Sequence, residues 1–303
     1  MNSTSNKPSN KARLQLVLSM SIFGTLAIFV RNISVSSGEL ALYRAVLAAS
    51  LLGVYFLANS KKSKKSSDGT NSNNPFRCTK KELILLLFSG MAMGFNWILL
   101  FEAYKYTSVS AATLSYYFAP IIVTIVCPFL FHEKLTKKQI LCFAMSTLGV
   151  FLITGVPDFQ NMGRDTIGIL FGLSAAVFYA TVILLNKFIK NVAGIHRTFL
   201  QFLAAIVTLI PYVALTSGFH LGTLDSKGWI NLLIVGLIHT GITYCLYFSS
   251  LKELPGQEAA ILSYVDPLMA VIISVAILGE RISLPQIIGG ILILGFAIWN
   301  EKE

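Results

Sequence analysis

The sequence predicts an all-α integral membrane protein whose ten transmembrane helices form two inverted five-helix repeats. Three observations predict this class: an apolar composition, an internal repeat and a one-sided distribution of positive charge. Hydrophobic residues make up 54% of the 303 residues and charged residues only 13%, whereas soluble domains carry about 25% charged residues. The length is therefore read as a series of bilayer crossings.

Ten apolar stretches follow one another along the chain, and a crossing needs about 20 such residues. They lie at residues 14–30, 40–58, 82–104, 109–131, 139–156, 166–186, 196–216, 228–250, 257–278 and 284–300. We expect residues 14–156 to form the first repeat and residues 166–300 the second. The polar residues 1–13 and the basic, Ser/Asn-rich segment 59–81 are expected to be disordered and cytoplasmic.

The fourth and ninth spans carry matched proline segments. At a constant shift of 147 residues, Tyr117 coincides with Tyr264 and Pro120 with Pro267. Proline removes a backbone donor and clashes with the preceding turn, so we expect a helix break at each. A broken backbone inside lipid needs protein or a water-filled cavity around it, and interrupted helices in corresponding positions of two halves point to a transporter binding site. Because each half holds five spans, the halves must insert with opposite orientation.

Positive charge gathers on one side of this topology. With the N-terminus inside, 18 of the 24 Lys and Arg residues fall in inside segments and five in outside segments. Lys and Arg favour cytoplasmic loops, so both termini are expected to be cytoplasmic, in a bacterial plasma membrane. The net charge of +10 is then a topology signal. The basic loop lacks interleaved aromatic residues, so no nucleic-acid partner is expected.

A doubled motif follows the two prolines. After each proline and a hydrophobic stretch come residues 132–136 (His-Glu-Lys-Leu-Thr) or 279–283 (Gly-Glu-Arg-Ile-Ser), and then Gln139 or Gln286. With Arg44 after Tyr43, this pattern resembles the EamA branch of the drug/metabolite transporter superfamily over nearly the whole chain. The resemblance implies a ten-helix carrier with a central cavity. Many members export amino acids or related metabolites, and others carry different small solutes.

Two charged residues lie within predicted spans. Arg44 is near the outer end of the second span, and Asp266 lies mid-span directly before Pro267. A charge at bilayer depth costs about 2.5 kcal/mol or more, so it normally faces a cavity or a partner. We expect Arg44 to bind an anionic group or to act in gating, and Asp266 to receive a substrate amine, pair with Arg44 or carry a coupling proton. The alternatives are a snorkelling arginine and a neutral carboxyl bonded to carbonyls freed by the proline.

Aromatic residues surround the same region. Tyr116, Tyr117 and Tyr264 flank the breaks, and Trp97 lies in the third span. They suit the wall of a mostly apolar cavity with few polar groups. The alternative is packing between helices with each polar tip satisfied.

Asn96 and His239 are the remaining candidates. Asn96 is expected either to donate into the cavity or to bond across helices, and His239 either to serve a proton relay or to bond a carbonyl. The four cysteines match no metal-site spacing and suggest no disulfide, so neither a metal nor another cofactor is expected.

These observations predict a secondary transporter of small organic solutes that works by alternating access, exporting amino acids or related metabolites. Arg44 and Asp266 together would complement a zwitterion, and proton coupling and oligomeric state stay open. An exporter of lipophilic cations or drugs needs only Asp266 and aromatic residues. A channel-like or non-transporting membrane protein is a further alternative, although a channel favours a continuous polar stripe. The chain carries no phosphate loop, zinc-protease signature or nucleophile elbow, so an enzyme is not expected.

Overall fold

The computed structural model describes residues 10–30, 32–63, 79–107, 112, 115–131, 135–154, 162–192, 194–278 and 284–301, and over these residues it is helical without strands. In chain order the elements are α1 (Asn10–Phe23), α2 (Leu26–Val30), α3 (Ser37–Ser63), α4 (Lys80–Tyr106), α6 (Phe118–Phe131), α7 (Lys137–Thr154), α8 (Met162–Phe188), α9 (Gly194–Thr216), the 3-10 helix η2 (Leu221–Thr223), α10 (Ser226–Leu233), the π-helix η3 (Ile234–Ile242), α11 (Thr243–Leu251), α12 (Gly256–Leu262), α13 (Val265–Leu278) and α14 (Leu284–Glu301).

Six helical stretches in the described part are long and apolar enough to cross a membrane. They are Asn10–Val30, Ser37–Ala58, Lys80–Tyr106, Thr166–Phe188, Gly194–Thr216 and Ser226–Leu251. Two further apolar helices, Phe118–Phe131 and Ile287–Asn300, are shorter. Each of the ten predicted spans overlaps one helix or a run of two or three successive helices. The count of ten crossings stays a prediction, because six stretches meet the length and hydropathy required.

Several predicted boundaries were wrong. Helix α1 already begins at Asn10, so residues 10–13 belong to the helix rather than to a disordered tail. Helix α3 continues to Ser63 and α4 begins at Lys80, which shortens the predicted loop 59–81 from both sides. Thr79 and Glu82 form a capping box at the start of α4, and this explains its early beginning. Residues 1–9 and 64–78, and the motif glutamates Glu133 and Glu280, lie outside the described residues.

Two irregularities were not predicted. The first span is interrupted by a turn at Gly24 and Thr25, between α1 and α2. The eighth span contains the π-helix η3, in which the Thr240 and Thr243 hydroxyls donate to carbonyls five residues earlier, at 2.8 Å and 2.9 Å. Neither irregularity changes the apolar pattern of its span, so hydropathy does not reveal it.

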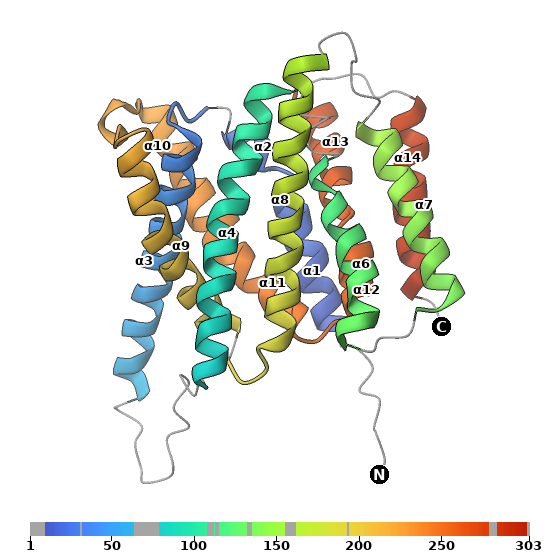
Figure 1. Ribbon diagram of the computed structural model, residues 1–303, viewed down its shortest axis with the longest axis horizontal. Coiled ribbons are helices and arrows are strands. Elements are labelled where there is room, and N and C mark those ends of the chain that lie inside the picture. The colour runs from blue at the N-terminus through green and yellow to red at the C-terminus, as the bar shows by residue number, and fades with distance from the viewer. Residues whose placement is uncertain are drawn as a thin grey trace.

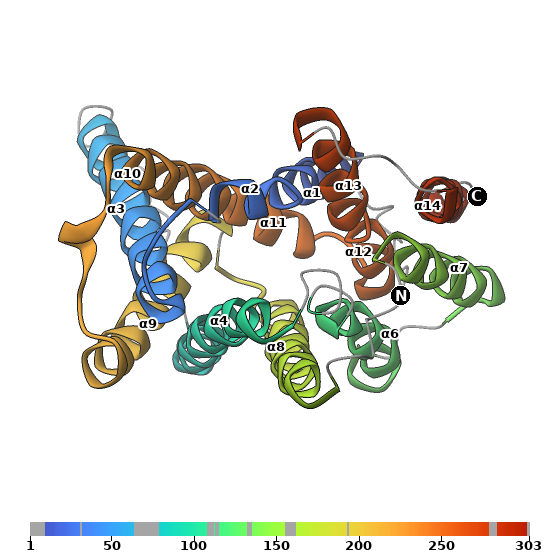
Figure 2. The ribbon, with the colours of Figure 1, turned by 90° about the horizontal axis from the view of Figure 1, so that it is seen from above.

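The two halves run in opposite directions. Helix α1 rises from the lower end of the bundle in Figure 1, whereas α8, the first helix of the second half, descends from the upper end. Viewed from above, α1, α2 and α11 face α4 and α8, with α3, α9 and α10 on one side and α6, α7, α12, α13 and α14 on the other (Figure 2).

Residues that match across the 147-residue shift touch each other. The Trp97 Nε1 donates to the Tyr244 hydroxyl at 2.8 Å, and the rings of Tyr117 and Tyr264 lie 6.2 Å apart. Repeat mates can contact each other only near the axis that relates the repeats. Both pairs therefore place that axis in the middle of the bundle.

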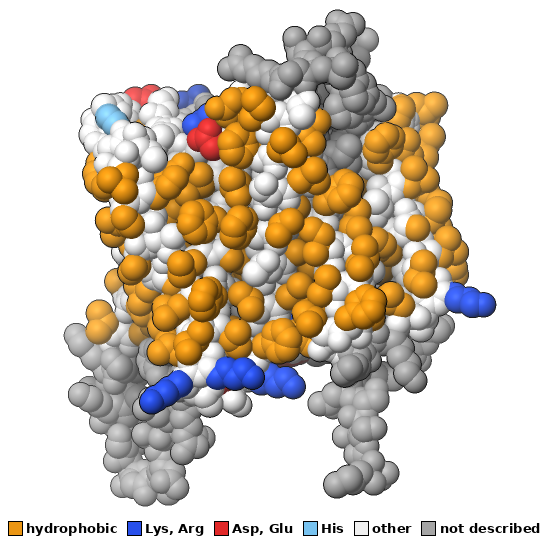
Figure 3. All heavy atoms as spheres, viewed as in Figure 1, with side chains coloured by type: hydrophobic (Ala, Val, Ile, Leu, Met, Phe, Trp, Pro, Cys, Tyr) orange, Lys and Arg blue, Asp and Glu red, His pale blue; other side chains and the backbone are white. Residues whose placement is uncertain are grey.

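The outer surface is apolar along its height. Figure 3 shows hydrophobic side chains over the whole visible face and Lys and Arg side chains along its lower rim. Large apolar residues such as Phe129 and Leu215 are 78% and 87% exposed. Such a belt suits a lipid surround and not water.

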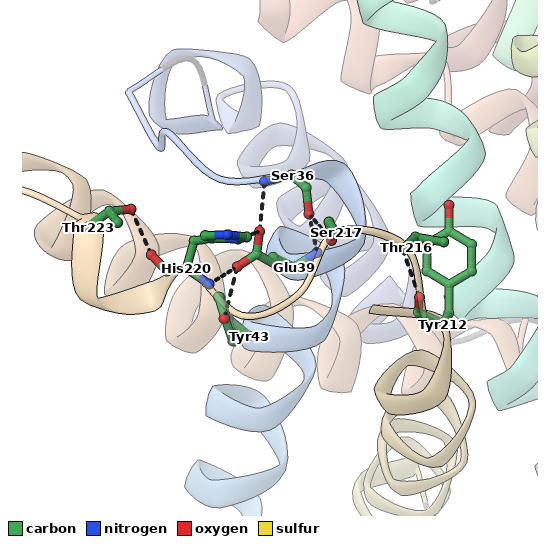
Figure 4. A network of polar contacts seen from close by, with 8 residues as sticks. All are labelled: Ser36, Glu39, Tyr43, Tyr212, Thr216, Ser217, His220 and Thr223. Atoms are coloured by element: carbon green, nitrogen blue, oxygen red, sulfur yellow. Dashed lines mark hydrogen bonds and ion pairs between the residues drawn. The ribbon is translucent and has the colours of Figure 1, made fainter. Parts of the chain in front are cut away.

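A polar network joins the start of α3 to the segment after α9 at the upper end of the bundle (Figure 4). Ser36 and Glu39 cap the start of α3, with backbone to side-chain bonds of 3.1 Å and 3.2 Å. The Ser36 hydroxyl donates to Ser217 at 2.8 Å, and the buried Glu39 carboxylate also accepts from Tyr43 at 3.1 Å and from the His220 backbone N–H. This buried carboxylate is thus fully used in joining structural elements.

Candidate substrate cavity

A cavity of about 300 Å³ lies in the middle of the bundle, where the repeat axis passes. The interruption at Gly24, the turn at Tyr117 and the break at Ser263 all border it. Its lining residues are Met20, Phe23, Gly24, Leu26, Val30, Arg44, Trp97, Leu100, Phe101, Tyr104, Tyr116, Tyr117, Pro120, Tyr179, Tyr244, Tyr247, Ser263, Asp266 and Pro267. The cavity is therefore built by both repeats and by the broken segments of each.

The cavity lies at the middle height of the bundle in Figure 1, because the descending helix α8 contributes Tyr179 and the descending span Ser226–Leu251 contributes Tyr244 and Tyr247, each past the midpoint of its span. Helix α4 contributes only Trp97 to Tyr104 from its second half, and the first span contributes Met20 to Val30. Both spans begin at the lower end, where α1 starts. The lining stretch of α4 covers eight residues, Trp97 to Tyr104, or about 10 Å of helix rise.

The lower end is closed by contacts between the repeats. The Arg13 Nε of α1 forms an ion pair of 2.6 Å with the Glu258 Oε1 of α12. At Gly256, the first residue of α12, a Cβ would collide with the Cys127 sulfur of α6. The absence of a side chain at Gly256 thus lets α12 pack directly on α6.

Both prolines lie in the first turn of the helix that follows a break. Pro120 is the third residue of α6, after a turn at Tyr117, and Pro267 is the third residue of α13, after turns at Ser263 and Tyr264. Backbone N–H groups in a first turn have no intrahelical partner, so proline removes no hydrogen bond there. Each proline lies at the start of the helix that follows a break, and the turns lie three or four residues earlier.

Arg44 is only 2% exposed and lines the cavity. Its Nε donates to the Thr240 hydroxyl at 2.8 Å, and its guanidinium lies 4.5 Å from the Trp97 ring centroid and 5.8 Å from that of Phe101. No Asp or Glu among the described residues forms an ion pair with it. Aromatic faces offset part of the cost of burying this charge, but the cation keeps capacity for an anionic partner.

Asp266 lies on another wall of the same cavity, in the first turn of α13. Its carboxyl has the Tyr117 hydroxyl as hydrogen-bond partner. Arg44 and Asp266 do not pair with each other, because no ion pair within 4.0 Å joins them. One cavity therefore holds a cation and a carboxyl with space between them.

Tyrosines form most of the remaining polar lining. The rings of Tyr116 and Tyr179 stack at 5.2 Å between centroids, and the Tyr179 hydroxyl donates to the Tyr247 hydroxyl at 2.8 Å. The Tyr244 hydroxyl accepts from Trp97. The wall is thus aromatic, with few polar groups in fixed positions.

Of the predicted site residues, the structure places Arg44, Trp97, Tyr116, Tyr117 and Asp266 on the cavity wall together with both prolines. The other three lie behind it, among their own partners. They are Asn96, Tyr264 and His239.

Each of these three has a partner that explains its place. Asn96 donates to the Ala175 carbonyl at 2.8 Å and also bonds the hydroxyl of Tyr116, so it supports a lining tyrosine. The Tyr264 hydroxyl bonds Thr147 at 2.9 Å. His239 bonds the Thr25 hydroxyl at 2.7 Å, beside the break in the first span.

Sequence reasoning missed several lining aromatics, including Phe23, Phe101, Tyr104, Tyr179 and Tyr247. One signal was present for Tyr247, since its mate at the 147-residue shift is Leu100, which also lines the cavity. Tyr179 has no such signal, because tyrosine is common among helix-packing residues.

The fold and the cavity define a class of protein. An all-helical, lipid-facing bundle of two opposed repeats around a largely aromatic cavity with a few polar groups is typical of a membrane transporter. The sequence pattern of the EamA-like transporter family matches residues 10–155 and again residues 166–300. The chain belongs to the EamA-like transporter family and is a multi-pass membrane transporter.

Relatives agree with this assignment. The uncharacterized transporter YxxF of Bacillus subtilis is 32% identical over 299 residues, which cover 96% of this chain and 89% of that protein. An uncharacterized transporter of Archaeoglobus fulgidus is 26% identical over 295 residues, covering 94% and 95%. A crystal structure of 17% identity superposes with a TM-score of 0.78 over 94% of this chain and 95% of the other, which shows a shared fold.

Proposed function

We propose that this transporter is a secondary carrier that exports a small zwitterionic solute, an amino acid or a related metabolite, across the plasma membrane by alternating access. The observation that carries the proposal is the presence of Arg44 and Asp266, unpaired with each other, on the wall of one cavity. Arg44 would receive the carboxylate of the substrate and Asp266 its amine. Trp97, Tyr116 and Tyr117 would contact its carbon skeleton.

The size and the lining of the cavity support this substrate class. A volume of about 300 Å³ lies at the small end of the range for ligand pockets. The aromatic wall suits an apolar or aromatic side chain. A lipophilic cation is the second candidate, because Asp266 and the tyrosines alone would hold it. Arg44 speaks against it, since a buried cation without a carboxylate partner repels a second positive charge.

The distribution of charge and the contacts at the lower end of the bundle support the proposed orientation in the membrane and the proposed alternating access. With ten crossings, the preference of Lys and Arg for cytoplasmic loops would put the Lys/Arg-rich end, where α1 begins, in the cytoplasm. The contact of α12 with α1 and α6 would then close the cavity toward the cytoplasm. Transport requires this contact to open while the outer end closes. Asp266 is the group that we propose for proton coupling.

Exchange in proteoliposomes tests the proposal. Vesicles are loaded with a mixed pool of metabolites, with and without a proton gradient, and the contents are followed by mass spectrometry. We expect selective loss of amino acids, strongly reduced by Asp266→Asn at unchanged membrane expression. Glu102→Gln, which removes a partly exposed carboxylate outside the cavity, is the matched control and should transport normally.

Each result has a distinct meaning. Loss of cations alone would replace the zwitterion by the drug-like substrate. Wild-type turnover in Asp266→Asn would remove Asp266 from the site. A solute that leaves equally with and without the gradient would exclude proton coupling.

A further inference from the structure

We propose that Thr240 is a positioning residue for Arg44, and that the π-helix η3 exists at this point to place its hydroxyl. The inference rests on the proposed role of Arg44 in substrate binding. Thr240 is 0% exposed and is not part of the cavity lining, so it would act on the substrate only through Arg44.

The hydrogen bonds at Thr240 give its hydroxyl a defined direction. Its Oγ1 donates to the Val235 carbonyl at 2.8 Å, which uses its only proton. The oxygen then offers its lone pairs to Arg44, whose Nε donates to it at 2.8 Å. Since Nε carries one of the five guanidinium N–H donors, the four terminal donors remain for other partners. The Trp97 ring, whose centroid lies 4.5 Å from the guanidinium carbon, is the second group that holds the guanidinium in place.

The π-helix brings this hydroxyl to Arg44 through close packing on α3. A Cβ at Gly236 would lie 2.6 Å from the Leu47 Cβ, and one at Gly241 would lie 2.9 Å from a Leu51 methyl. Both leucines follow Arg44 on α3, so glycines before and after Thr240 let the two backbones meet beside it. Extra-wide turns of this kind are frequently found at functional sites.

Thr243 separates this role from a purely structural one. It is also 0% exposed, lies within one turn of Thr240, and donates to a carbonyl five residues back, that of Ile238, at 2.9 Å. Among the hydrogen bonds of the described residues, none joins it to Arg44. Thr243→Val therefore removes the same kind of intrahelical bond, while the contacts of the Arg44 guanidinium with Thr240 and Trp97 stay in place.

Three probes that carry a carboxylate, an amine or both test the inference. Their affinities are measured with the protein solubilised in detergent. L-phenylalanine carries both groups, 3-phenylpropanoate carries only the carboxylate, and phenethylamine carries only the amine. Loss of a hydrogen bond to a charged group predicts that Thr240→Val binds the two carboxylate probes about tenfold more weakly. Phenethylamine affinity should stay within about twofold, and Thr240→Ser should restore wild-type affinities for all three.

Two results would overturn the inference. One is equal weakening of all three probes in Thr240→Val, or equal weakening by Thr240→Val and Thr243→Val, which would show a structural role. The other is unchanged affinity for the carboxylate probes.

Trp97 fluorescence provides a readout that needs no ligand. Replacing the surface residues Trp229 and Trp299 with phenylalanine leaves Trp97 as the only tryptophan, so tryptophan fluorescence reports on this residue alone. Thr240→Val should shift its emission, because the guanidinium over the ring loses its anchor, whereas Thr240→Ser and Thr243→Val should not. If no probe binds the wild type, the zwitterion proposal fails, and this measurement still decides the role of Thr240: identical spectra in all variants would refute it.

Discussion

The ion pair between Arg13 and Glu258 is expected to hold the lower end of the cavity closed. It joins α1 of the first repeat to α12 of the second at 2.6 Å, with side chains that are 28% and 9% exposed. Alternating access requires α12 to move away from α1 and α6. Arg13→Gln should therefore shift the protein toward the state that opens at this end.

The size of the shift follows from the partial burial of the pair. Exposed ion pairs contribute about 0.2–1 kcal/mol, and removing one partner of a fully buried pair costs about 3–5 kcal/mol. With one partner nearly buried and the other partly exposed, we expect about 1.4 kcal/mol. That is about a tenfold change in the ratio of the two states.

Cys127 is a native reporter of this change. It is 0% exposed and packs against Gly256, so separation of α6 from α12 uncovers its sulfur. The other cysteines are first replaced by alanine at positions 78, 142 and 245. The rate of maleimide labelling from the side of the membrane at which α1 begins should then rise about tenfold in Arg13→Gln.

Two further variants make the result specific. The charge exchange Arg13→Glu with Glu258→Arg should return labelling to the wild-type rate. Glu102→Gln removes an ion pair of 2.7 Å with Lys105 that lies within a single helix, and it should leave labelling unchanged. The reasoning is refuted if Arg13→Gln labels at the wild-type rate, or if the exchange labels as fast as the single variant.

Two further predictions concern packing. Gly90→Ala should lower the melting temperature by a few degrees, because a Cβ there would lie 2.6 Å from the Ala204 Cβ and overpacking costs about 1–3 kcal/mol. Gly295→Ala, where no atom lies within 4 Å of the new Cβ, should melt as wild type, and equal melting of both variants would contradict the argument. In a double-mutant cycle, Trp97→Phe and Tyr244→Phe should be coupled by about 1 kcal/mol through their 2.8 Å bond. Additive effects would show that this bond does not join the repeats.

The fold class was predictable because it depends on composition. A chain with this apolar content must bury its backbone polar groups in helices within a membrane, and the repeat was visible at a single shift. Helix irregularity was less accessible. The turn at Gly24 and the π-helix around Thr240 keep the apolar pattern of ordinary helices, and they exist because side-chain hydroxyls and neighbouring helices satisfy the altered backbone.

The cavity was predictable where burial is costly. Arg44 and Asp266 stood out because a charge at bilayer depth is costly unless it faces a cavity or a partner. The structure places both on the wall of one cavity. Tyrosine gives no such signal, since it suits a cavity and a helix contact equally well. Tyr264 shows the limit of repeat reasoning: its mate Tyr117 lines the cavity, while its own hydroxyl bonds Thr147.

The two repeats match in sequence at several positions, but the charged residues that line the cavity do not match. Asp266 matches Ala119 at the 147-residue shift, so each repeat contributes one charged group, Arg44 from the first and Asp266 from the second. Apolar and aromatic mates, such as Leu100 and Tyr247, leave a similar wall when the repeats exchange conformations. A zwitterion held between Arg44 and Asp266 would instead bridge the repeats and keep one orientation in both states. In the proposed mechanism the symmetric wall permits the rocking motion, and the asymmetric charges select which solute travels with it.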